Sequence, residues 1–469
     1  PAYSGVDGKP VALRYDQYRN GYGCFTCCRC SVAFGVLWGL RNVGGPDLLR
    51  SYYVGPHTPR RTNAQERQLL KSFTNEAGKA YGALIMSDAS IQKHEKVFAA
   101  PKIDAEGREN LIGLSLQELI DLLQSYQIPA FRAKQVWHWI YQRGVKSFDD
   151  MGNIPKDMKV FFKERFSLGR PVVETEQRSK DGTIKWLLKL NDGQMVETVF
   201  IPESDRGTLC VSSQIGCTLT CKFCHTGTQA LVRNLGAHEI LQQIMHARDV
   251  LGEWPSTAAK DGGREFTNIV MMGMGEPLYN YQNVSKALKI CMDVEGLSIS
   301  KRRITLSTSG VVPLIEKCGE ELNVNLAISL HACNDELRSE IMPINKKYPL
   351  ESLMQACRSY PLDKRRKITF EYVMLKGVND SDADAHNLAT LLGDIPAKVN
   401  LIPFNEWPGS GFVCSDMDRI EKFAKILRDK GLDSPIRKTR GDDILAACGQ
   451  LKSASQRFKR EKEQPELDK

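Results

Sequence analysis

Three cysteines at short, uneven spacing carry the strongest chemical signal in this chain. They stand in the run Cys217-Thr-Leu-Thr-Cys221-Lys-Phe-Cys224. Thiolates at these spacings can bind three irons of a 4Fe-4S cubane, which leaves the fourth iron open to another ligand. A ferredoxin would want a fourth cysteine nearby, zinc sites usually take four ligands in two pairs, and a structural disulfide does not suit a reducing cytosol. The pattern therefore favours an iron–sulfur cluster.

Other candidate residues stand where predicted strands end. Gly275 and Glu276 follow one strand in the run Gly273-Met-Gly275-Glu276-Pro277, and Asn405 follows another. Ser307 and the run Ser329-Leu330-His331 lie at comparable positions. The carboxyl ends of parallel strands are where barrel sites form, so ligand contacts are expected here. Taken singly, the glycine-rich run is equally compatible with a turn, and an isolated histidine is more often a structural residue.

The elements that must position these residues alternate regularly. From Thr208 onward, β-rich runs alternate with helical patterns, which indicates an α/β fold with parallel βαβ units, in a barrel or an open doubly wound sheet. The predicted strands are Leu209–Ser213, Thr267–Met272, Ile304–Ser307, Asn323–Leu330, Lys367–Leu375, Lys398–Pro403 and Pro435–Lys438. Before them, Thr183–Leu190 and Gln194–Pro202 form a predicted hairpin around Asn191-Asp192-Gly193.

A small helical domain is predicted ahead of the hairpin. Ser115 and Glu118 form a capping-box pattern, the apolar face that follows ends at Pro129, and a second helix fits Arg132 to Gln142. Residues 132–170 have a net charge of +5 and are rich in aromatic residues. Cations for phosphates and rings for unstacked bases would suit RNA. The same rings at helical spacing would equally form a core with solvated charged neighbours.

The first 85 residues differ from the rest of the chain. They hold 11 of the 37 glycines, no methionine and a net charge of +6 out of +8. We expect Met86 to be the natural start and residues 1–85 to be an extension outside the native protein. The run Cys24, Cys27, Cys28 and Cys30 has zinc-ligand spacing but no second pair nearby. No apolar stretch is long enough for a bilayer, so we expect a cytoplasmic protein with no membrane contact.

The motifs together identify a family. The informative stretches are Met195-Val-Glu197-Thr198, Leu209-Cys210-Val-Ser-Ser-Gln-Ile-Gly216-Cys217, Gly273-Met-Gly275-Glu276-Pro277, Ser329-Leu330-His331-Ala332, Pro403-Phe404-Asn405 and Arg440-Gly-Asp-Asp-Ile-Leu-Ala-Ala-Cys448-Gly-Gln. With the cysteine run, they make residues 111–455 resemble the RlmN/Cfr family of radical S-adenosylmethionine (SAM) RNA adenine methyltransferases. The resemblance implies a partial (β/α)6 radical SAM barrel with a small N-terminal helical domain.

The resemblance also implies a domain order. Residues 86–110 are then a polar tail, 111–180 a small helical RNA-contacting domain, 181–207 a β-hairpin connector, 208–450 the partial barrel and 451–469 a charged tail. The implied cofactors are a 4Fe-4S cluster on Cys217, Cys221 and Cys224, and SAM, two molecules per turnover. The residues implied around SAM are Gly275, Glu276, Ser307, Ser329, Leu330, His331 and Asn405.

The family mechanism assigns roles to three further residues. Cys448 takes a methyl group from one SAM by displacement, although Ala446-Ala447-Cys448 alone would pass for packing. A radical from a second SAM then activates that methyl group for addition to adenine C2, an electron-poor carbon that cannot attack SAM itself. Glu197 is the implied base for the C2 proton. Cys210 resolves the adduct by forming a disulfide bond with Cys448.

The implied substrate is adenine C2 in 23S rRNA and in tRNA, with a flavodoxin-type reductant. A Cfr-type enzyme that methylates C8 shares nearly every motif, and product analysis would separate the two. An iron–sulfur RNA-binding or electron-transfer protein is the alternative from another class. That alternative predicts no need for Cys448 and no SAM cleavage.

Overall fold

The computed structural model describes residues 103–104, 106–204, 206–255, 264–363 and 365–455. The expected extension 1–85, with its Cys24 to Cys30 cluster, lies outside the described residues, as do residues 86–102 and 456–469. In the part of the chain that is described, no helix combines the length and apolarity needed to cross a membrane.

One nine-stranded sheet organises the described chain, in the order β13-β12-β11-β10-β9-β6-β5-β4-β3. The six strands from β13 to β6 are parallel, as predicted for βαβ units. Their bounds are Gly207–Cys210 for β6, Asn268–Met271 for β9, Ile304–Thr308 for β10, Asn325–Ser329 for β11, Ile368–Met374 for β12 and Ala397–Pro403 for β13. The prediction of an α/β fold with six parallel strands is confirmed.

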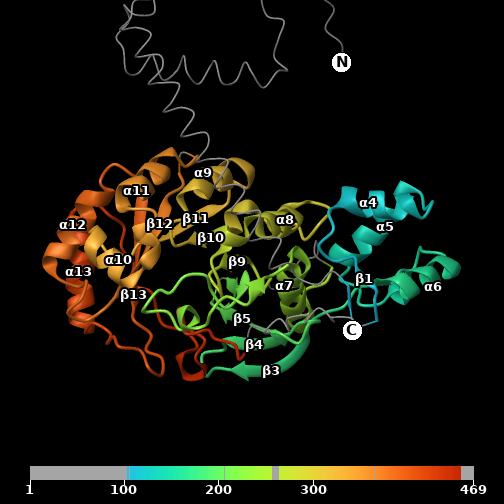
Figure 1. Cartoon of the computed structure of the whole chain (residues 1–469), viewed down its shortest axis with the longest axis horizontal. Coiled ribbons are helices and arrows are strands. Elements are labelled where there is room, and N and C mark those ends of the chain that lie inside the picture. Colours follow the sequence, from blue (N-terminus) through green and yellow to red (C-terminus); the bar gives the residue numbers. More distant parts are fainter. Residues whose placement is uncertain (1–102, 105, 205, 256–263, 364, 456–469) are drawn as a thin grey trace, which may run out of the picture. The chain divides into compact units, whose positions relative to one another are not determined.

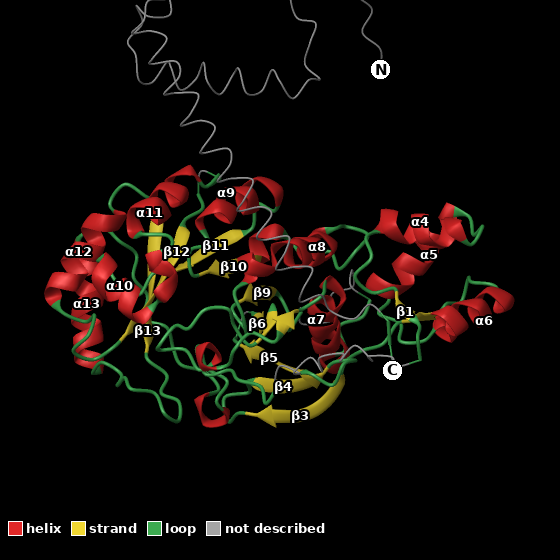
Figure 2. Cartoon of the chain, in the orientation of Figure 1, coloured by secondary structure: helices red, strands yellow, loops and turns green. Residues whose placement is uncertain are grey.

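Helices connect the parallel strands and cover their outer side (Figures 1 and 2). Their bounds are Ala237–Leu251 for α7, Tyr281–Met292 for α8, Val312–Glu321 for α9, Asp335–Ile341 for α10, Leu350–Ser359 for α11, Asp382–Leu392 for α12 and Met417–Asp429 for α13. Apolar side chains such as Leu306, Ile328 and Phe370 are completely buried. This helix-on-sheet layer is the main hydrophobic core, whose burial is the dominant favourable contribution to folding.

The inner side of the six parallel strands is unusually polar. Because successive side chains of a strand point to opposite faces, every second residue faces inward. The inward positions include Thr208, Asn268, Thr305, Ser307, Ser329, Thr369, Glu371, Lys398 and Asn400, which line two cavities. The interior of the partial barrel is therefore a polar chamber.

The predicted hairpin is part of the same sheet. Strands β3 (Val172–Arg178), β4 (Ile184–Lys189) and β5 (Met195–Pro202) continue it in antiparallel pairing, with β5 against β6. The hairpin is thus more than a connector, and β3 was missed because all of its residues are exposed and show no alternation. The strand predicted at residues 435–438 is absent from the structure. In this segment Ile436 makes only an isolated bridge to Leu401.

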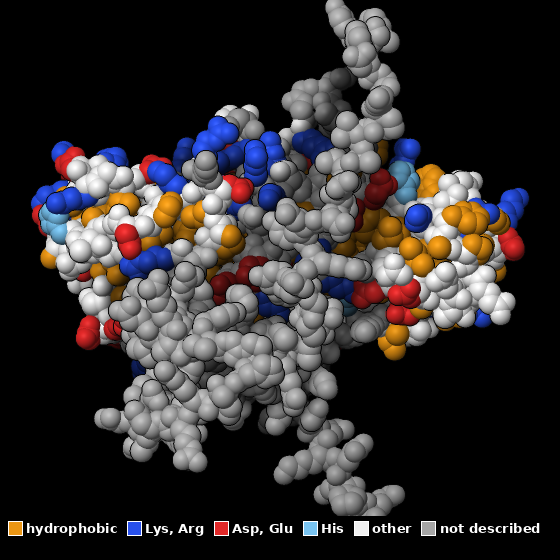
Figure 3. Space-filling view, turned by 90° about the horizontal axis from the view of Figure 1, so that it is seen from above, with side chains coloured by type: hydrophobic (Ala, Val, Ile, Leu, Met, Phe, Trp, Pro, Cys, Tyr) orange, Lys and Arg blue, Asp and Glu red, His pale blue; other side chains and the backbone are white. Residues whose placement is uncertain are grey.

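The helical region consists of α4 (Leu116–Ser125), α5 (Ala130–Tyr141) and α6 (Lys156–Arg165). The predicted capping box is present: Ser115 Oγ accepts from the Glu118 amide, and the Glu118 carboxylate accepts from the Ser115 amide. The rings of Trp137, Tyr141 and Phe162 are buried, so most of the aromatic residues form a core, and the RNA-stacking interpretation does not hold for them. Exposed hydrophobic side chains nevertheless gather over this region (Figure 3), including those of Tyr126, Phe131 and Val160.

Candidate active site

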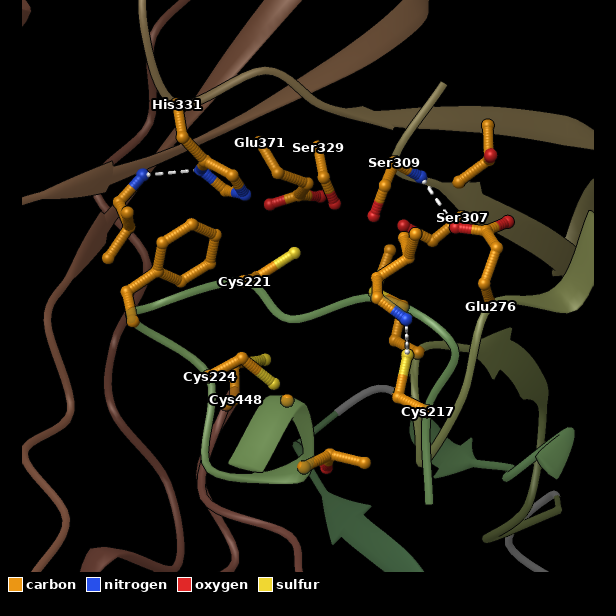
Figure 4. A pocket seen from close by; sticks show the side chains of 18 of the residues that line it. Cys217, Cys221, Cys224, Glu276, Ser307, Ser309, Ser329, His331, Glu371 and Cys448 are labelled. Atoms are coloured by element: carbon orange, nitrogen blue, oxygen red, sulfur yellow. Dashed lines mark hydrogen bonds between the residues drawn. The ribbon is translucent and has the colours of Figure 1, made fainter. Parts of the chain in front are cut away.

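The three-cysteine loop follows the barrel's first strand and faces a cavity. The cavity lies at the carboxyl ends of the parallel strands and is lined by all three thiol residues, Cys217, Cys221 and Cys224 (Figure 4). Backbone contacts shape the loop: the Cys224 amide donates to the Cys221 carbonyl at 3.1 Å, and the Leu219 amide donates to Cys217 Sγ at 3.3 Å.

The arrangement of these thiols suits a cluster better than a single ion. Among the described residues, no three His, Cys, Asp or Glu side chains converge as the ligands of one metal ion would. A 4Fe-4S cubane needs thiols on three different irons and so tolerates wider separation. Burial raises the pKa of the Cys217 thiol to about 12 and also raises that of Cys224, so an iron cation must stabilise the thiolates that bind it.

Glu276 is fixed by backbone donors at the end of β9. Its carboxylate accepts from the Leu278 amide at 3.1 Å and from the Ser309 amide at 2.8 Å. Burial raises the pKa of this carboxyl, and the backbone donors oppose that shift. Gly275 has φ +96°, and a Cβ there would lie 2.4 Å from Gln214 Cβ. Only glycine fits the approach that brings Glu276 into the cavity.

His331 lies across the cavity in a defined tautomer. Its Nδ1 accepts from the Val373 amide at 3.0 Å, as Figure 4 shows, so the proton of the neutral ring lies on Nε2. Burial lowers the pKa of this imidazole to about 3, so the ring is neutral at physiological pH. Its ring contacts the Phe223 ring edge-on, with centroids 4.6 Å apart. Ser307 and Ser329 line the same cavity from the ends of β10 and β11.

Two residues expected near SAM occupy other positions. The Leu330 side chain is fully buried, and its amide donates to the Glu371 carbonyl at 3.1 Å. Asn405 lines a second cavity instead. Its side-chain amide donates to the Cys448 carbonyl at 3.1 Å and therefore orients the backbone at Cys448.

The second cavity, of about 540 Å³, occupies the amino-terminal half of the strands. It meets the first cavity at a shared wall made of Met272, Glu371, Ile402, Arg437, Cys448 and Gly449. Cys448 therefore faces both cavities, whereas Cys210 faces only the second. The structure thus brings the two predicted thiols to one chamber, next to the cysteine loop.

The half-buried cation Arg437 lies close to both thiols. Its interaction with Cys448, and more weakly with Glu371 and Cys210, raises the pKa of its guanidinium. Burial raises the pKa of the Cys210 thiol to about 12, and the Cys448 thiol adds to that shift. Both cysteines are free thiols, so the predicted disulfide bond is absent from the described structure.

Glu197 lies outside both cavities. It is buried on β5, pairs with Lys185 at 3.2 Å and accepts from the Lys452 amide at 2.8 Å. Burial raises the pKa of its carboxyl, although Lys185 opposes that shift. Lys185 also donates to the Leu445 carbonyl at 3.2 Å. Glu197 and Lys185 thus hold both sides of the segment that carries Cys448.

Three charged residues of the site escaped the sequence analysis: Glu371, Arg437 and Arg338. Arg338 is fully buried, and its guanidinium donates to the carbonyls of Ser309, Ser329 and Leu330 at 2.8 to 3.1 Å. Glu371 could have been recognised as a candidate site residue because it is a charged residue inside the apolar run Ile368–Met374. Arg338 gave none, because an arginine on a helix is normally solvated.

Comparison with protein-family models gives two matches. Residues 211–389 match the radical SAM superfamily, and residues 109–168 match the ribosomal RNA large subunit methyltransferase N-terminal domain. The first match covers the cysteine loop and most of the parallel strands. The second covers the helical region.

Curated relatives and a solved structure agree with these matches. The chain is 61% identical over 349 residues to the dual-specificity RNA methyltransferase RlmN of Rhodospirillum rubrum, covering 74% of this chain and 81% of the relative. It is 56% identical over 392 residues to the corresponding protein of Rhizobium meliloti, covering 80% and 95%. A radical SAM methyltransferase from Sphaerobacter thermophilus has a similar structure, with TM-score 0.68 and 43% identity over 73% of this chain and 98% of that one.

Proposed function

This chain belongs to the RlmN family of SAM-dependent radical RNA methyltransferases, and we propose that it methylates C2 of an adenine in 23S rRNA and in tRNA through an S-methylated Cys448. The observation that carries the proposal is the position of Cys448. It faces the cavity of the cysteine loop on one side and the cavity of Cys210 on the other.

The cofactors are a 4Fe-4S cluster and SAM, which together supply a methyl group and a carbon-centred radical. We assign the cluster to Cys217, Cys221 and Cys224, whose thiols suit it. Around SAM, Glu276 offers a fixed carboxylate for the ammonium group and His331 a neutral Nε2–H donor. Gly275, Ser307 and Ser329 complete this set of cavity-lining residues.

Cys448 performs the first transfer in this proposal. Its thiolate would attack the methyl carbon of SAM: a carbon–sulfur bond to Cys448 forms, the bond from the methyl carbon to the sulfonium breaks, and S-adenosylhomocysteine leaves. Arg437 supports this role, because its guanidinium lies close to the Cys448 sulfur at the reacting end of the cavity. The methylated sulfur then faces the second cavity, where an RNA base can reach it.

Cys210 and Glu197 complete the reaction as we propose it. Glu197 removes the C2 proton from the RNA–protein adduct; its pKa, raised by burial, suits a proton acceptor near neutral pH. Because Glu197 holds the Lys452 amide and lines neither cavity, this step requires the Cys448 segment to move. Cys210 then attacks Cys448 Sγ, which releases the methylated base and forms a disulfide that two electrons must reduce before the next turnover.

Nucleoside analysis of treated RNA tests the proposal. Purified tRNA and 23S rRNA, incubated with SAM and reductant, should yield 2-methyladenosine. Cys448→Ala should yield neither methylated protein nor product, whereas Cys210→Ala should accumulate RNA covalently bound to protein. A product methylated at C8 would favour the Cfr-type activity. If no RNA were methylated and Cys448→Ala bound RNA as well as the wild-type protein, the RNA-binding alternative would be favoured.

We further propose a flavodoxin-type protein as the electron donor and the cytoplasm, where rRNA and tRNA reside, as the location. The helical region 109–168 is proposed to contact RNA through its positive charge and exposed side chains. Its match to a ribosomal RNA methyltransferase N-terminal domain supports this assignment.

A further inference from the structure

The second cavity extends beyond the reacting thiols and has the polar lining and the volume of a ligand-binding site. Cys210, Cys448 and Arg437 occupy its inner end. The remainder is lined by polar side chains from the first residues of the barrel strands, among them Thr208, Asn268, Thr305, Thr369 and Lys398. Its volume of about 540 Å³ lies within the range of roughly 300–1,000 Å³ typical of ligand pockets. The cavity therefore runs from the thiols to the amino-terminal end of the barrel.

A pair of side chains on adjacent strands lines this cavity, and one of them, Glu371, belongs to the wall shared with the first cavity. Glu371 of β12 is 4% exposed, and its Oε1 accepts from the side-chain amide of Asn400 on β13 at 3.1 Å. Its other oxygen, Oε2, is buried and has no hydrogen-bond partner among the described residues. A buried polar atom without a partner is energetically costly, and a ligand group that donates to Oε2 would satisfy it. Figure 4 shows the Glu371 carboxyl pointing into the chamber near Ser329 and His331.

The protonation state of Glu371 decides what it can bind. Burial raises the pKa of its carboxyl, and Arg437, Asn400 and Lys398 oppose that shift. A neutral carboxylic acid presents one O–H donor next to one carbonyl acceptor. Adenine has the complementary pair on one edge, since N1 accepts and the N6 amino group donates. Guanine has a carbonyl oxygen at position 6 and N1–H instead, so its edge needs the donor and the acceptor in the opposite order.

Two cations line the part of the cavity away from the thiols. Lys398 is half-buried at the start of β13, and Lys438 is exposed nearby in the lining. Neither lysine forms an ion pair with any described residue, whereas Arg206 is paired with Glu203 and Arg440 with Asp181. Lysines without an ion pair in the lining of a polar cavity suit the phosphates on either side of an extruded nucleotide.

We propose that the second cavity holds the adenosine to be methylated, with its N1 and N6 edge recognised by Glu371 and its flanking phosphates bound by Lys398 and Lys438. RNA would then approach from the amino-terminal ends of the barrel strands, opposite the cysteine loop. C2 is bonded to N1, so a base held through this edge presents C2 beside Glu371, where Cys448 forms the same wall. This inference rests on the proposed function and adds the base-recognition residue and the RNA path.

Paired changes in protein and base test the recognition contact. The substrates are a short RNA hairpin with one loop adenine and the same hairpin with purine riboside, which lacks the N6 amino group. With reconstituted wild-type holoenzyme, the loss of N6 should reduce kcat/KM about tenfold or more, as expected for one lost base-edge contact pair. Glu371→Leu should lose the same factor on the adenine hairpin and discriminate little between the two RNAs.

Glu371→Gln separates recognition from other roles of this residue. Its amide again presents one donor beside one acceptor, so this variant should retain most of the discrimination that Glu371→Leu loses. A glutamine variant as defective as the leucine variant would mean that the negative charge is required, and a matching loss of SAM affinity would place Glu371 in the SAM site. Either result would overturn the assignment.

The lysines are tested by RNA affinity, measured by fluorescence anisotropy over a salt series. The double variant Lys398→Glu, Lys438→Glu should bind the hairpin more weakly, with the salt slope reduced by about one to two. The control Lys346→Glu, Lys430→Glu makes the same charge change at exposed positions away from the cavity and should bind normally. Equal binding by both double variants would refute the RNA path. Failure of the wild-type protein to methylate the hairpin, tRNA or rRNA would instead refute the proposed function.

Discussion

Gly275→Ala should destabilise the protein and abolish ordered SAM binding, for a reason that can be worked out from the backbone. At φ +96°, a residue with a Cβ is strained by roughly 1–3 kcal/mol. The added Cβ would also lie 2.4 Å from Gln214 Cβ and 2.9 Å from the Gln214 amide nitrogen, so backbone must shift. Overpacking of this kind typically costs about 1–3 kcal/mol. Together these contributions predict a loss of about 2–6 kcal/mol in the free energy of unfolding.

Two other glycines separate strain from overlap. Gly377 has φ +69° with no atom within 4 Å of an added Cβ, so Gly377→Ala tests strain without overlap. Gly169 has open space and an ordinary φ, so Gly169→Ala should be nearly neutral. We expect melting temperatures to fall in the order Gly169→Ala, Gly377→Ala, Gly275→Ala, with the last lowered by on the order of 5–10 °C.

The functional readout is SAM affinity, measured by isothermal titration on the reconstituted protein. A shift of Gly275 displaces Glu276, whose carboxylate is held by the Leu278 and Ser309 amides. SAM affinity should therefore fall in Gly275→Ala and remain normal in both control variants. If Gly275→Ala were as stable as Gly377→Ala and bound SAM equally well, the close approach of Gly275 to Gln214 would have no role.

Further predictions concern the cluster, Arg338 and the resolving thiol. Alanine at any cysteine of the Cys217–Cys224 loop should abolish the bound iron and the visible absorption after anaerobic reconstitution; normal iron in all three variants would exclude the assignment. Arg338→Lys keeps the positive charge but loses the guanidinium group that donates to three carbonyls, so SAM affinity should fall about tenfold. The control Arg358→Lys makes the same change at an exposed position of α11 and should leave SAM affinity unchanged. Because the pKa of Cys210 is raised to about 12, its thiolate fraction grows about tenfold per pH unit below that value. Single-turnover product release should therefore accelerate from pH 7 to pH 9, and a flat profile would contradict this role.

Local patterns account for what could be predicted. The capping box at Ser115, the turn before Gly193 and the alternation of β-rich and helical runs each depend on residues close in sequence, and each is present in the structure. The cysteine loop was recognisable for the same reason, since its spacing is itself the ligand pattern. The exposed strand β3 was missed because its pairing with β4 decides its conformation more than its own side chains do.

Burial could not be predicted from the same patterns. The aromatic residues of α5 and α6 had two interpretations, as a core or as an RNA surface, and only packing showed that Trp137 and Phe162 are interior. Arg338 and Glu371 look like ordinary surface charges in the sequence. Tertiary contacts remove them from water, and that desolvation determines the protonation of Glu371 and makes Arg338 a link between strand ends.

Most of the parallel strands, the capping box and the cysteine spacing could be predicted from the sequence, because they depend on local conformational preference and short-range periodicity; β3 and the absence of a strand at 435–438 could not. Tertiary packing brings Cys210 and Cys448, 238 positions apart, to one chamber, where Cys448, unlike Cys210, faces both cavities. It also separated Asn405 and Glu197 from the first cavity. Such placements depend on how strands curve and which chain ends meet, and no local pattern encodes the distance between residues on different strands.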